Sequence, residues 1–240
     1  MKYQTIRREY QHHGQLVGSV FVDPYATLLS PFVTKLCLKL KLIPNVVTLC
    51  MIGSGILGAV FFALPFLWAK IAGTVLIHLW YVLDCSDGEV ARITKRFSDF
   101  GTEIDYAAHV VNHPLFLLAF LLTLLQANTG WGTLPLCLLF FGLVSLNLVY
   151  RNAVMFRKVY DWKTAKPGEP APPAKPGGIR VVIQYIADIF VQLPNFCLIF
   201  PLVYFLSARA AVWYAVVVLA FSAVFVPLAM LGWLRRIVNR

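Results

Sequence analysis

Six apolar runs, each close to the length that crosses a lipid bilayer, limit what this chain can fold into. They cover residues 45–67, 71–92, 104–126, 133–156, 182–206 and 212–234. A transmembrane helix needs about 20 consecutive apolar residues to cross the hydrocarbon core. Hydrophobic residues make up 59% of the 240, which is too many for an ordinary soluble domain. The sequence therefore predicts one all-α integral membrane domain, residues 1–240, with six transmembrane helices.

The positive charges predict how this domain sits in the membrane. If the six runs all span, every Lys and Arg falls on one side except Lys70 and Arg209, out of 21 in total. The positive-inside rule then places both termini in the cytoplasm. The net charge of +10 is interpreted as a cytoplasmic rim that meets anionic membrane lipids and phosphorylated substrates. A nucleic-acid partner is not expected, because no aromatic-basic module accompanies the charge.

Two segments outside the spans have patterns of their own. Residues 24–42 are predicted as a juxtamembrane amphipathic helix that lies on the cytoplasmic surface. Within this range, Ser30 followed by Pro31 has the pattern of a helix start. The alternative is a linker whose periodicity arises by chance. Residues 164–178 contain five prolines and three glycines and are predicted to be a flexible cytoplasmic loop.

Acidic residues gather between Asp84 and His109, at the flanks of the second and third apolar runs. Six of the eleven acids of the chain lie in this stretch. Helical spacing places Asp84, Asp87, Gly88 and Ala91 on one face, and Gly101, Asp105 and His109 on one face of the next helix. Carboxylates held together in a medium of low polarity require cations, and hard divalent ions take oxygen ligands. The stretch therefore predicts a metal-phosphate site that opens to the cytoplasm.

The same residues resemble the signature of the CDP-alcohol phosphotransferase family, D-x2-D-G-x2-A-R-x8-G-x3-D-x3-D. The chain departs from it at the last position, where His109 stands in place of the aspartate. Fixed spacing over many positions in a polytopic protein makes the resemblance specific. The seven positions that match are Asp84, Asp87, Gly88, Ala91, Arg92, Gly101 and Asp105.

The resemblance implies a membrane transferase that moves a substituted phosphate from a CDP-activated alcohol to an acceptor hydroxyl and releases CMP. The donor is either a lipid resembling CDP-diacylglycerol or a soluble CDP-alcohol. Asp84, Asp87 and Asp105 would hold one or two divalent cations, Mg2+ or Mn2+. Room for the cytidine and phosphates would come from Gly88, Ala91 and Gly101, while Arg92 would contact phosphate or brace the aspartates. A homodimer is implied as well.

His109 and Asp105 are the expected catalytic residues. In the family pattern the residue at position 109 takes the proton of the acceptor. A histidine can do this, because an unperturbed imidazole with a pKa of about 6.5 is largely neutral at cytoplasmic pH. Imidazole is a poorer magnesium ligand than a carboxylate, so a second ion should bind weakly or be manganese. One turn further on, Asn112 and His113 are expected to line the deep end of the cavity without a catalytic role.

Further candidates lie outside the signature. Asn45 and Thr48 either help bind the nucleotide or satisfy backbone groups at a helix start. Arg151 and Arg157 are candidates for binding the acceptor or a phosphate, with topological anchoring as the alternative. Asp188, an acid within the fifth run, either lines the acceptor pocket or pairs with Arg151.

Two other functions stay open at this stage. Acids inside a membrane also build cation or solute transporters, although no internal repeat supports one here. The histidine at position 109 also fits a family member that binds nucleotide without catalysis.

Overall fold

A computed structural model describes residues 2–11, 22–164 and 189–238, and all regular secondary structure in these ranges is helical. The N-terminal part contains α1 (Tyr3–Thr5), a π-helical turn η1 (Ile6–Tyr10) and α2 (Val22–Lys39). The long helices are α3 (Pro44–Ala63), α4 (Leu67–Thr94), α5 (Gly101–Gln126) and α6 (Thr133–Thr164). They are followed by α8 (Leu193–Leu206) and α9 (Ala208–Val238).

Four of the described helices are long and apolar enough to cross a membrane. They cover Pro44–Ala63, Glu103–Gln126, Thr133–Arg157 and Ala208–Arg235. The second predicted span corresponds to α4, whose 28 residues include Lys70 and His78 as well as Asp84, Asp87 and Arg92 of the signature. The fifth corresponds in part to α8, an apolar helix of 14 residues, while residues 182–188 lie outside the described ranges. An all-helical protein embedded in the membrane is thus confirmed, and the count of six spans stays a prediction.

The helices α3 and α4 pack closely because glycines face each other. A Cβ atom on Gly73 would lie 2.5 Å from the backbone nitrogen of Phe62 and 2.8 Å from the carbonyl oxygen of Gly58. At the same end of α3, Lys70 Nζ and Thr123 Oγ1 donate to the Phe62 carbonyl at 3.0 and 2.8 Å. These two donors satisfy the carbonyl of Phe62 in the last turn of α3, where carbonyls have no partner within the helix. The contacts fix α3, α4 and α5 as one unit.

The helix α2 runs from Val22 to Lys39, close to the predicted range 24–42. We expected Ser30 and Pro31 at a helix start, but Pro31 lies inside α2. Proline has no N–H, so Pro31 cannot donate to the Thr27 carbonyl four residues before it. Gln11 Nε2 donates to that carbonyl instead, at 2.6 Å. This hydrogen bond from Gln11 replaces the one that Pro31 cannot make, so the helix continues through the proline.

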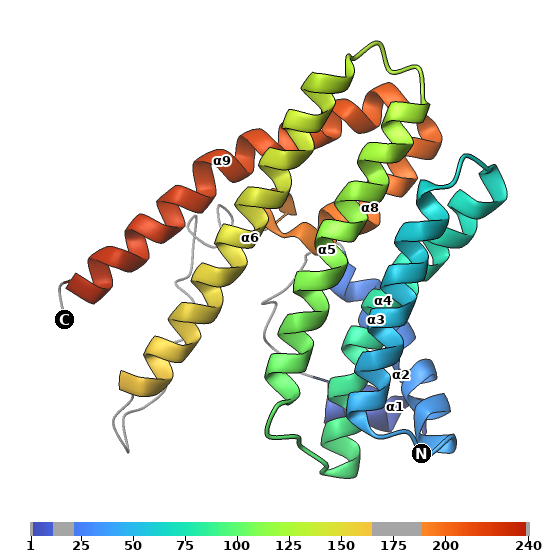
Figure 1. Ribbon diagram of the computed structural model, residues 1–240. Helices are drawn as coiled ribbons and strands as arrows, with labels where there is room; N and C mark the ends of the chain where they lie inside the picture. Colours follow the sequence, from blue (N-terminus) through green and yellow to red (C-terminus); the bar gives the residue numbers. More distant parts are fainter. Residues whose placement is uncertain (1, 12–21, 165–188, 239–240) are drawn as a thin grey trace.

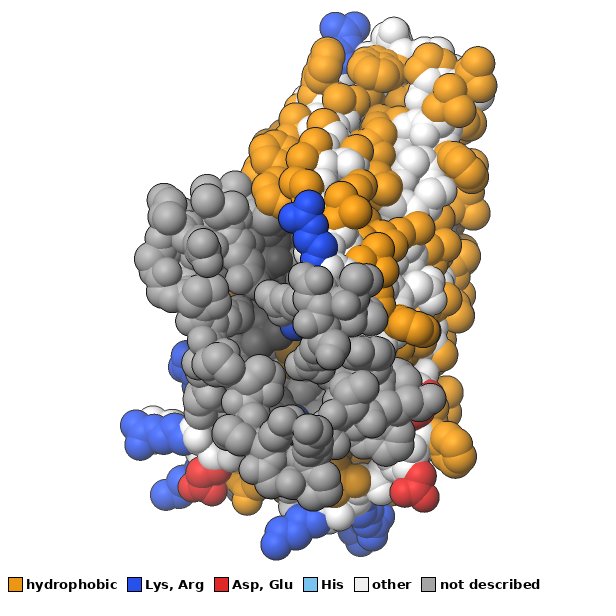
Figure 2. Space-filling model, turned by 90° about the vertical axis from the view of Figure 1, so that its left-hand side faces the viewer, with side chains coloured by type: hydrophobic (Ala, Val, Ile, Leu, Met, Phe, Trp, Pro, Cys, Tyr) orange, Lys and Arg blue, Asp and Glu red, His pale blue; other side chains and the backbone are white. Residues whose placement is uncertain are grey.

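One end of the molecule carries the site. Figure 1 shows α1, α2, the start of α3 and the connection from α4 to α5 together at the lower end of the helices. On the face drawn in Figure 2, hydrophobic side chains cover the upper part, whereas the acidic and most basic side chains lie near the lower end. Four large apolar side chains of α2 and one just beyond its end are exposed at this lower end. They are Leu28, Leu29, Phe32 and Leu36 of α2, and Leu40.

Candidate active site

Asp84, Asp105 and His109 form the centre of the site. Asp84 lies on α4, whereas Asp105 and His109 lie one turn apart near the start of α5. His109 Nε2 is 3.2 Å from Asp84 Oδ1 and 3.4 Å from Asp105 Oδ1. The histidine side chain is only 9% exposed, compared with 21% for Asp84 and 45% for Asp105. The short connection from Lys95 to Phe100 turns the chain back and brings the two faces of the signature together.

The chemistry of this cluster fits a divalent cation. One ligand atom from each of Asp84, Asp105 and His109 lies within 4.8 Å of the other two. Two carboxylate oxygens are ligands of the kind that Mg2+ and Mn2+ prefer, and an imidazole nitrogen favours the softer Mn2+. The donor set therefore suits one ion of this class, with the imidazole of His109 beside the carboxylates that would hold it.

Asp87 lies one turn beyond Asp84 on α4 and is held from α3. Thr48 Oγ1 donates a hydrogen bond of 2.8 Å to Asp87 Oδ2. Thr48 is buried, and Asn45 at the first turn of α3 donates to Ser98 Oγ at 3.3 Å in the connection before α5. Thr48 Oγ1 also lies 3.3 Å from the backbone carbonyl oxygen of Pro44, a contact of the kind that the second predicted role described. Both residues brace the stretch that carries the signature, and nucleotide binding by them stays a prediction.

Gly88, Ala91 and Arg92 of the signature lie near the C-terminal end of α4, and Gly101 begins α5. Arg92 Nε donates to the backbone carbonyl of Tyr10 in η1, so the N-terminal segment lies against the signature. A Cβ atom on Gly88 would come within 3.0 Å of the Arg92 guanidinium, and one on Gly101 would meet only Ser98 at 3.7 Å. Ala91 is half-buried on α4. Gly88 therefore makes room for Arg92, whereas packing within the described chain does not require a glycine at 101.

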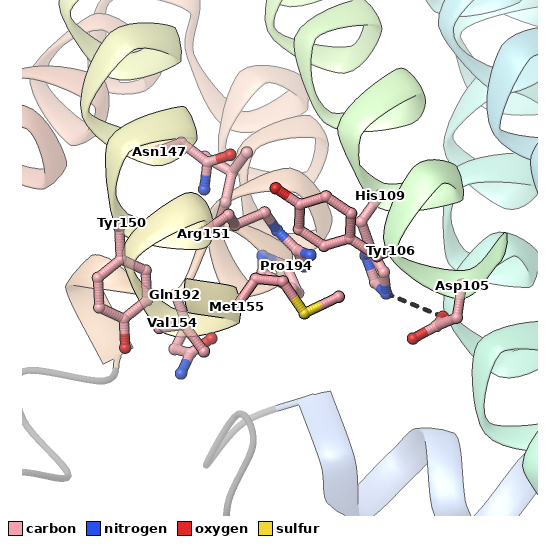
Figure 3. Close-up of a pocket in the computed structure, with 11 residues that line it drawn as sticks. Asp105, Tyr106, His109, Asn147, Tyr150, Arg151, Val154, Met155, Gln192 and Pro194 are labelled. Carbon is pink, nitrogen blue, oxygen red and sulfur yellow. Dashed lines mark ion pairs between the residues drawn. The ribbon is translucent and has the colours of Figure 1, made fainter. Parts of the chain in front are cut away.

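A cavity of about 250 Å³ adjoins the acidic cluster (Figure 3). Arg151 extends from α6 toward α5 across this cavity and interacts electrostatically with Asp84 and Asp105. Tyr106 Oη donates to Asn152 Oδ1 at 2.9 Å, which ties α5 to α6 at the cavity. The wall is thus polar on the side of the acids and partly apolar elsewhere. Its residues are Asp105, Tyr106, His109, Asn147, Tyr150, Arg151, Val154, Met155, Gln192, Leu193 and Pro194.

Of the other predicted acceptor residues, one lies outside the described wall of this cavity and one lies outside the described residues. Arg157 is exposed further along α6 and is not part of the wall. Asp188 lies outside the described residues, so its predicted pairing with Arg151 stays a prediction. Most of the predicted loop 164–178 also lies outside the described ranges.

Glu89 is a buried acid for which the sequence had suggested no role. It is 1% exposed, and it accepts hydrogen bonds from Ser30 Oγ at 2.5 Å, Thr34 Oγ1 at 2.6 Å and Gln11 Nε2 at 2.9 Å. These three donors come from the N-terminal segment and α2. Glu89 therefore anchors α2 and the N-terminal segment to α4, from a position that the signature leaves unspecified. In the sequence, the only signal that could have singled out Glu89 is its charge within the acidic stretch from Asp84 to His109.

Tyr106 was also missed as a cavity residue. It directly follows Asp105 in the sequence, but the signature says nothing about this position. Its place in the wall follows from how α6 packs against α5, which is tertiary information. Asn147 lies on α6 and Gln192 directly precedes α8, and both are polar positions within the fourth and fifth apolar runs.

Comparison with known protein families supports the interpretation of the signature. Residues 41–221, about three quarters of the chain, match CDP-alcohol phosphatidyltransferase. A search of curated proteins found no match. The matched range includes α3 to α6, and therefore every residue of the acidic cluster and most of the cavity wall. The chain belongs to the CDP-alcohol phosphatidyltransferase family.

Proposed function

We propose that the protein transfers a substituted phosphate from a CDP-activated alcohol to an acceptor hydroxyl and releases CMP, in the synthesis of a phospholipid or glycolipid. The observation that carries this proposal is the signature itself. Seven of its positions match, and α4 and α5 bring Asp84, Asp105 and His109 together beside a polar cavity. Family membership supports the reaction class.

The carboxylates of the signature are the proposed metal ligands. Asp84 and Asp105 face each other across the two helices, and Asp87 is held near them by Thr48. When bound there, a divalent ion supplies positive charge that stabilises the phosphate oxygens of the donor. Arg92 and Arg151 would add two cationic groups that bind phosphate from opposite sides of the site.

His109 is the proposed general base. The acceptor oxygen forms a bond to the phosphorus of the substituted phosphate, while the bond from that phosphorus to the bridging oxygen breaks. The electron pair of the broken bond leaves with CMP, and the acceptor proton goes to Nε2 of His109. The imidazolium that results lies 3.2 Å from Asp84 and 3.4 Å from Asp105, which favours its formation.

The cavity between α5 and α6 is the proposed acceptor site. Tyr106, Asn147, Tyr150 and Gln192 offer hydroxyl and amide groups that suit a polar, hydroxyl-bearing molecule, and Arg151 offers a charge. His109 is part of the same wall, so an acceptor bound there would reach its base directly. Gly88, Ala91 and Gly101 remain the proposed space for cytidine and phosphates.

A CMP-release assay tests the proposed reaction. Protein purified in detergent is supplied with CDP-diacylglycerol or with soluble CDP-alcohols, a panel of acceptor alcohols, and Mg2+ or Mn2+. We expect CMP release that requires both an acceptor and a divalent ion. Binding of cytidine nucleotides without CMP release for any pair would instead identify a non-catalytic member. A protein that binds no cytidine nucleotide would contradict the proposal and favour a transporter.

The proposal also includes the orientation of the protein in the membrane and its assembly into a homodimer. The basic side chains near the site support a cytoplasmic location of the site and both termini. A homodimer is proposed from the resemblance. The mass of the detergent-solubilised protein, measured by light scattering, would report its assembly.

A further inference from the structure

Arg92 of the signature is held by a segment that lies far away in the sequence. Its Nε donates to the backbone carbonyl of Tyr10, in the π-helical turn η1 and 82 residues earlier. The guanidinium lies over Gly88, because a Cβ atom there would come within 3.0 Å of Nη1 and 3.4 Å of Nη2. The arginine side chain therefore folds back along α4, toward the face that carries Asp84 and Asp87.

The hydrogen bond to Tyr10 uses only one of the three guanidinium nitrogens of Arg92. In the part of the chain that the structure describes, Nη1 and Nη2 have no hydrogen bond and no ion pair. Asp87 and Glu89 interact with this guanidinium electrostatically. A guanidinium that is fixed at Nε presents its two terminal amino groups in a defined plane. This is the geometry that binds a phosphate through two parallel hydrogen bonds.

The N-terminal segment, defined here as residues 3–11, is held in place on both sides of Tyr10. Before it, Ile6 is fully buried, although it lies close to the start of the chain. After it, Gln11 Nε2 donates to Glu89 Oε1 on α4 at 2.9 Å. The turn η1 between them packs against both α2 and α4. The carbonyl of Tyr10 is therefore fixed relative to the helix that carries Arg92.

We propose that Tyr10 is a positioning residue for the donor: its backbone carbonyl fixes the guanidinium of Arg92 over Gly88, where the terminal amino groups bind a phosphate of the CDP-activated alcohol. This inference rests on the proposed function. The family match covers residues 41–221, so Arg92 lies inside it and the N-terminal segment outside it. An arginine without this contact would lose many rotamers each time the donor binds, which weakens binding.

A pair of substitutions in the N-terminal segment tests this role. Ile6→Ser removes the buried anchor of the segment and changes no group that the proposed function places against a substrate. We expect the donor KM to rise about tenfold, with smaller changes in kcat and in the acceptor KM. Gln4→Ser is the matched control, because Gln4 is exposed in the same segment, and it should leave all three constants unchanged. Poor folding alone would reduce the number of active molecules, and so would lower the apparent kcat without changing KM.

A double-mutant cycle with Arg92→Ala shows whether the segment acts through this arginine. In the Arg92→Ala background, Ile6→Ser should change the donor KM by less than about twofold, because no guanidinium remains to be positioned. Equal rises in both backgrounds would overturn the proposal. The double variant Ile6→Ser with Gln11→Ala removes the contacts on both sides of Tyr10. A wild-type donor KM in this variant would overturn the proposal as well.

A binding measurement separates this inference from the proposed reaction. The affinity for CDP is measured by isothermal titration calorimetry with Mg2+ present, on the wild type, Ile6→Ser and Gln4→Ser. We expect Ile6→Ser to bind CDP about tenfold more weakly than the other two proteins. A wild type that binds no CDP would contradict the proposed function itself. Equal CDP affinity of the wild type and Ile6→Ser would contradict only the role of the N-terminal segment.

Discussion

His109 joins the two halves of the signature, since its Nε2 contacts an acid on α4 and an acid on its own helix. Loss of a general base typically lowers the rate about 10²- to 10⁴-fold. We therefore predict that His109→Ala lowers kcat for CMP release by at least about 10²-fold, and that His109→Asp restores part of this loss. The assay is steady-state CMP release at saturating donor and acceptor. An alanine variant with wild-type kcat would exclude His109 as the base.

Arg151 extends into the cavity from the helix opposite His109. A hydrogen bond to a charged group is worth about 1.5–3 kcal/mol, which corresponds to a tenfold or larger change in affinity. We therefore predict that Arg151→Ala raises the KM for donor or acceptor about tenfold or more, with a smaller effect on kcat.

Arg235→Ala is the matched control for Arg151→Ala. Arg235 is an exposed arginine on α9, outside the cavity wall, so its loss should leave both kinetic constants unchanged. If Arg151→Ala behaves like this control, Arg151 serves as a topological anchor and does not bind substrate.

At the scale of elements, α2 is held on α4 through one buried acid, Glu89. Replacing it by alanine leaves three buried or half-buried donors without their acceptor, which typically costs about 1–3 kcal/mol for each group. We predict that Glu89→Ala lowers the midpoint of thermal unfolding and exposes the N-terminal segment to protease. Glu89→Gln should have a smaller effect, because it keeps an acceptor oxygen.

Glu103→Ala provides the comparison for this prediction. Glu103 is an exposed acid in the first turn of α5, near the same end of the molecule. Its removal should leave thermal stability and protease resistance close to wild type. Equal behaviour of the two variants would show that Glu89 does not anchor α2.

Elements built from local patterns could be predicted from the sequence. The long apolar runs correspond to α3, α5, α6 and α9, and helical spacing predicted that Asp105 and His109 share a face. That Pro31 lies inside α2 could not be predicted, because the bond that accommodates it comes from Gln11, far outside the helix. The same holds for Glu89, whose partners are separated from it by 55 to 78 residues. Such pairings depend on tertiary packing, which no local pattern encodes.

At the scale of the whole molecule, the helices place a charged, oxygen-rich site at one end of an apolar bundle. The sequence predicted which acids meet, because the signature fixes their spacing on two adjacent helices. Apart from Asp105, His109 and Arg151, it did not single out the wall of the cavity, which α6 and the start of α8 complete from distant parts of the chain. Tyr106, for example, donates a hydrogen bond to Asn152, which lies 46 residues further along the chain.

Metal dependence follows from the same arrangement. We predict that a chelator reduces CMP release to background, and that added Mn2+ or Mg2+ restores it, because Asp84 and Asp105 offer carboxylate oxygens to a divalent ion. The measurement is the rate of CMP release after chelation and after titration with each ion. Full activity after exhaustive chelation would exclude a divalent ion from the reaction.

The most direct test of the central claim compares CMP release by the wild type with that by Asp105→Asn. Asparagine keeps the size of the side chain and removes the charge, so the fold should survive, as thermal unfolding would verify. A metal ligand at a reacting phosphate contributes several kcal/mol to the transition state, so the rate should fall about 10³-fold. Binding of Mn2+, followed by isothermal titration calorimetry, should weaken in parallel. Near-normal CMP release and unchanged Mn2+ affinity in a folded Asp105→Asn protein would contradict the assignment of the site.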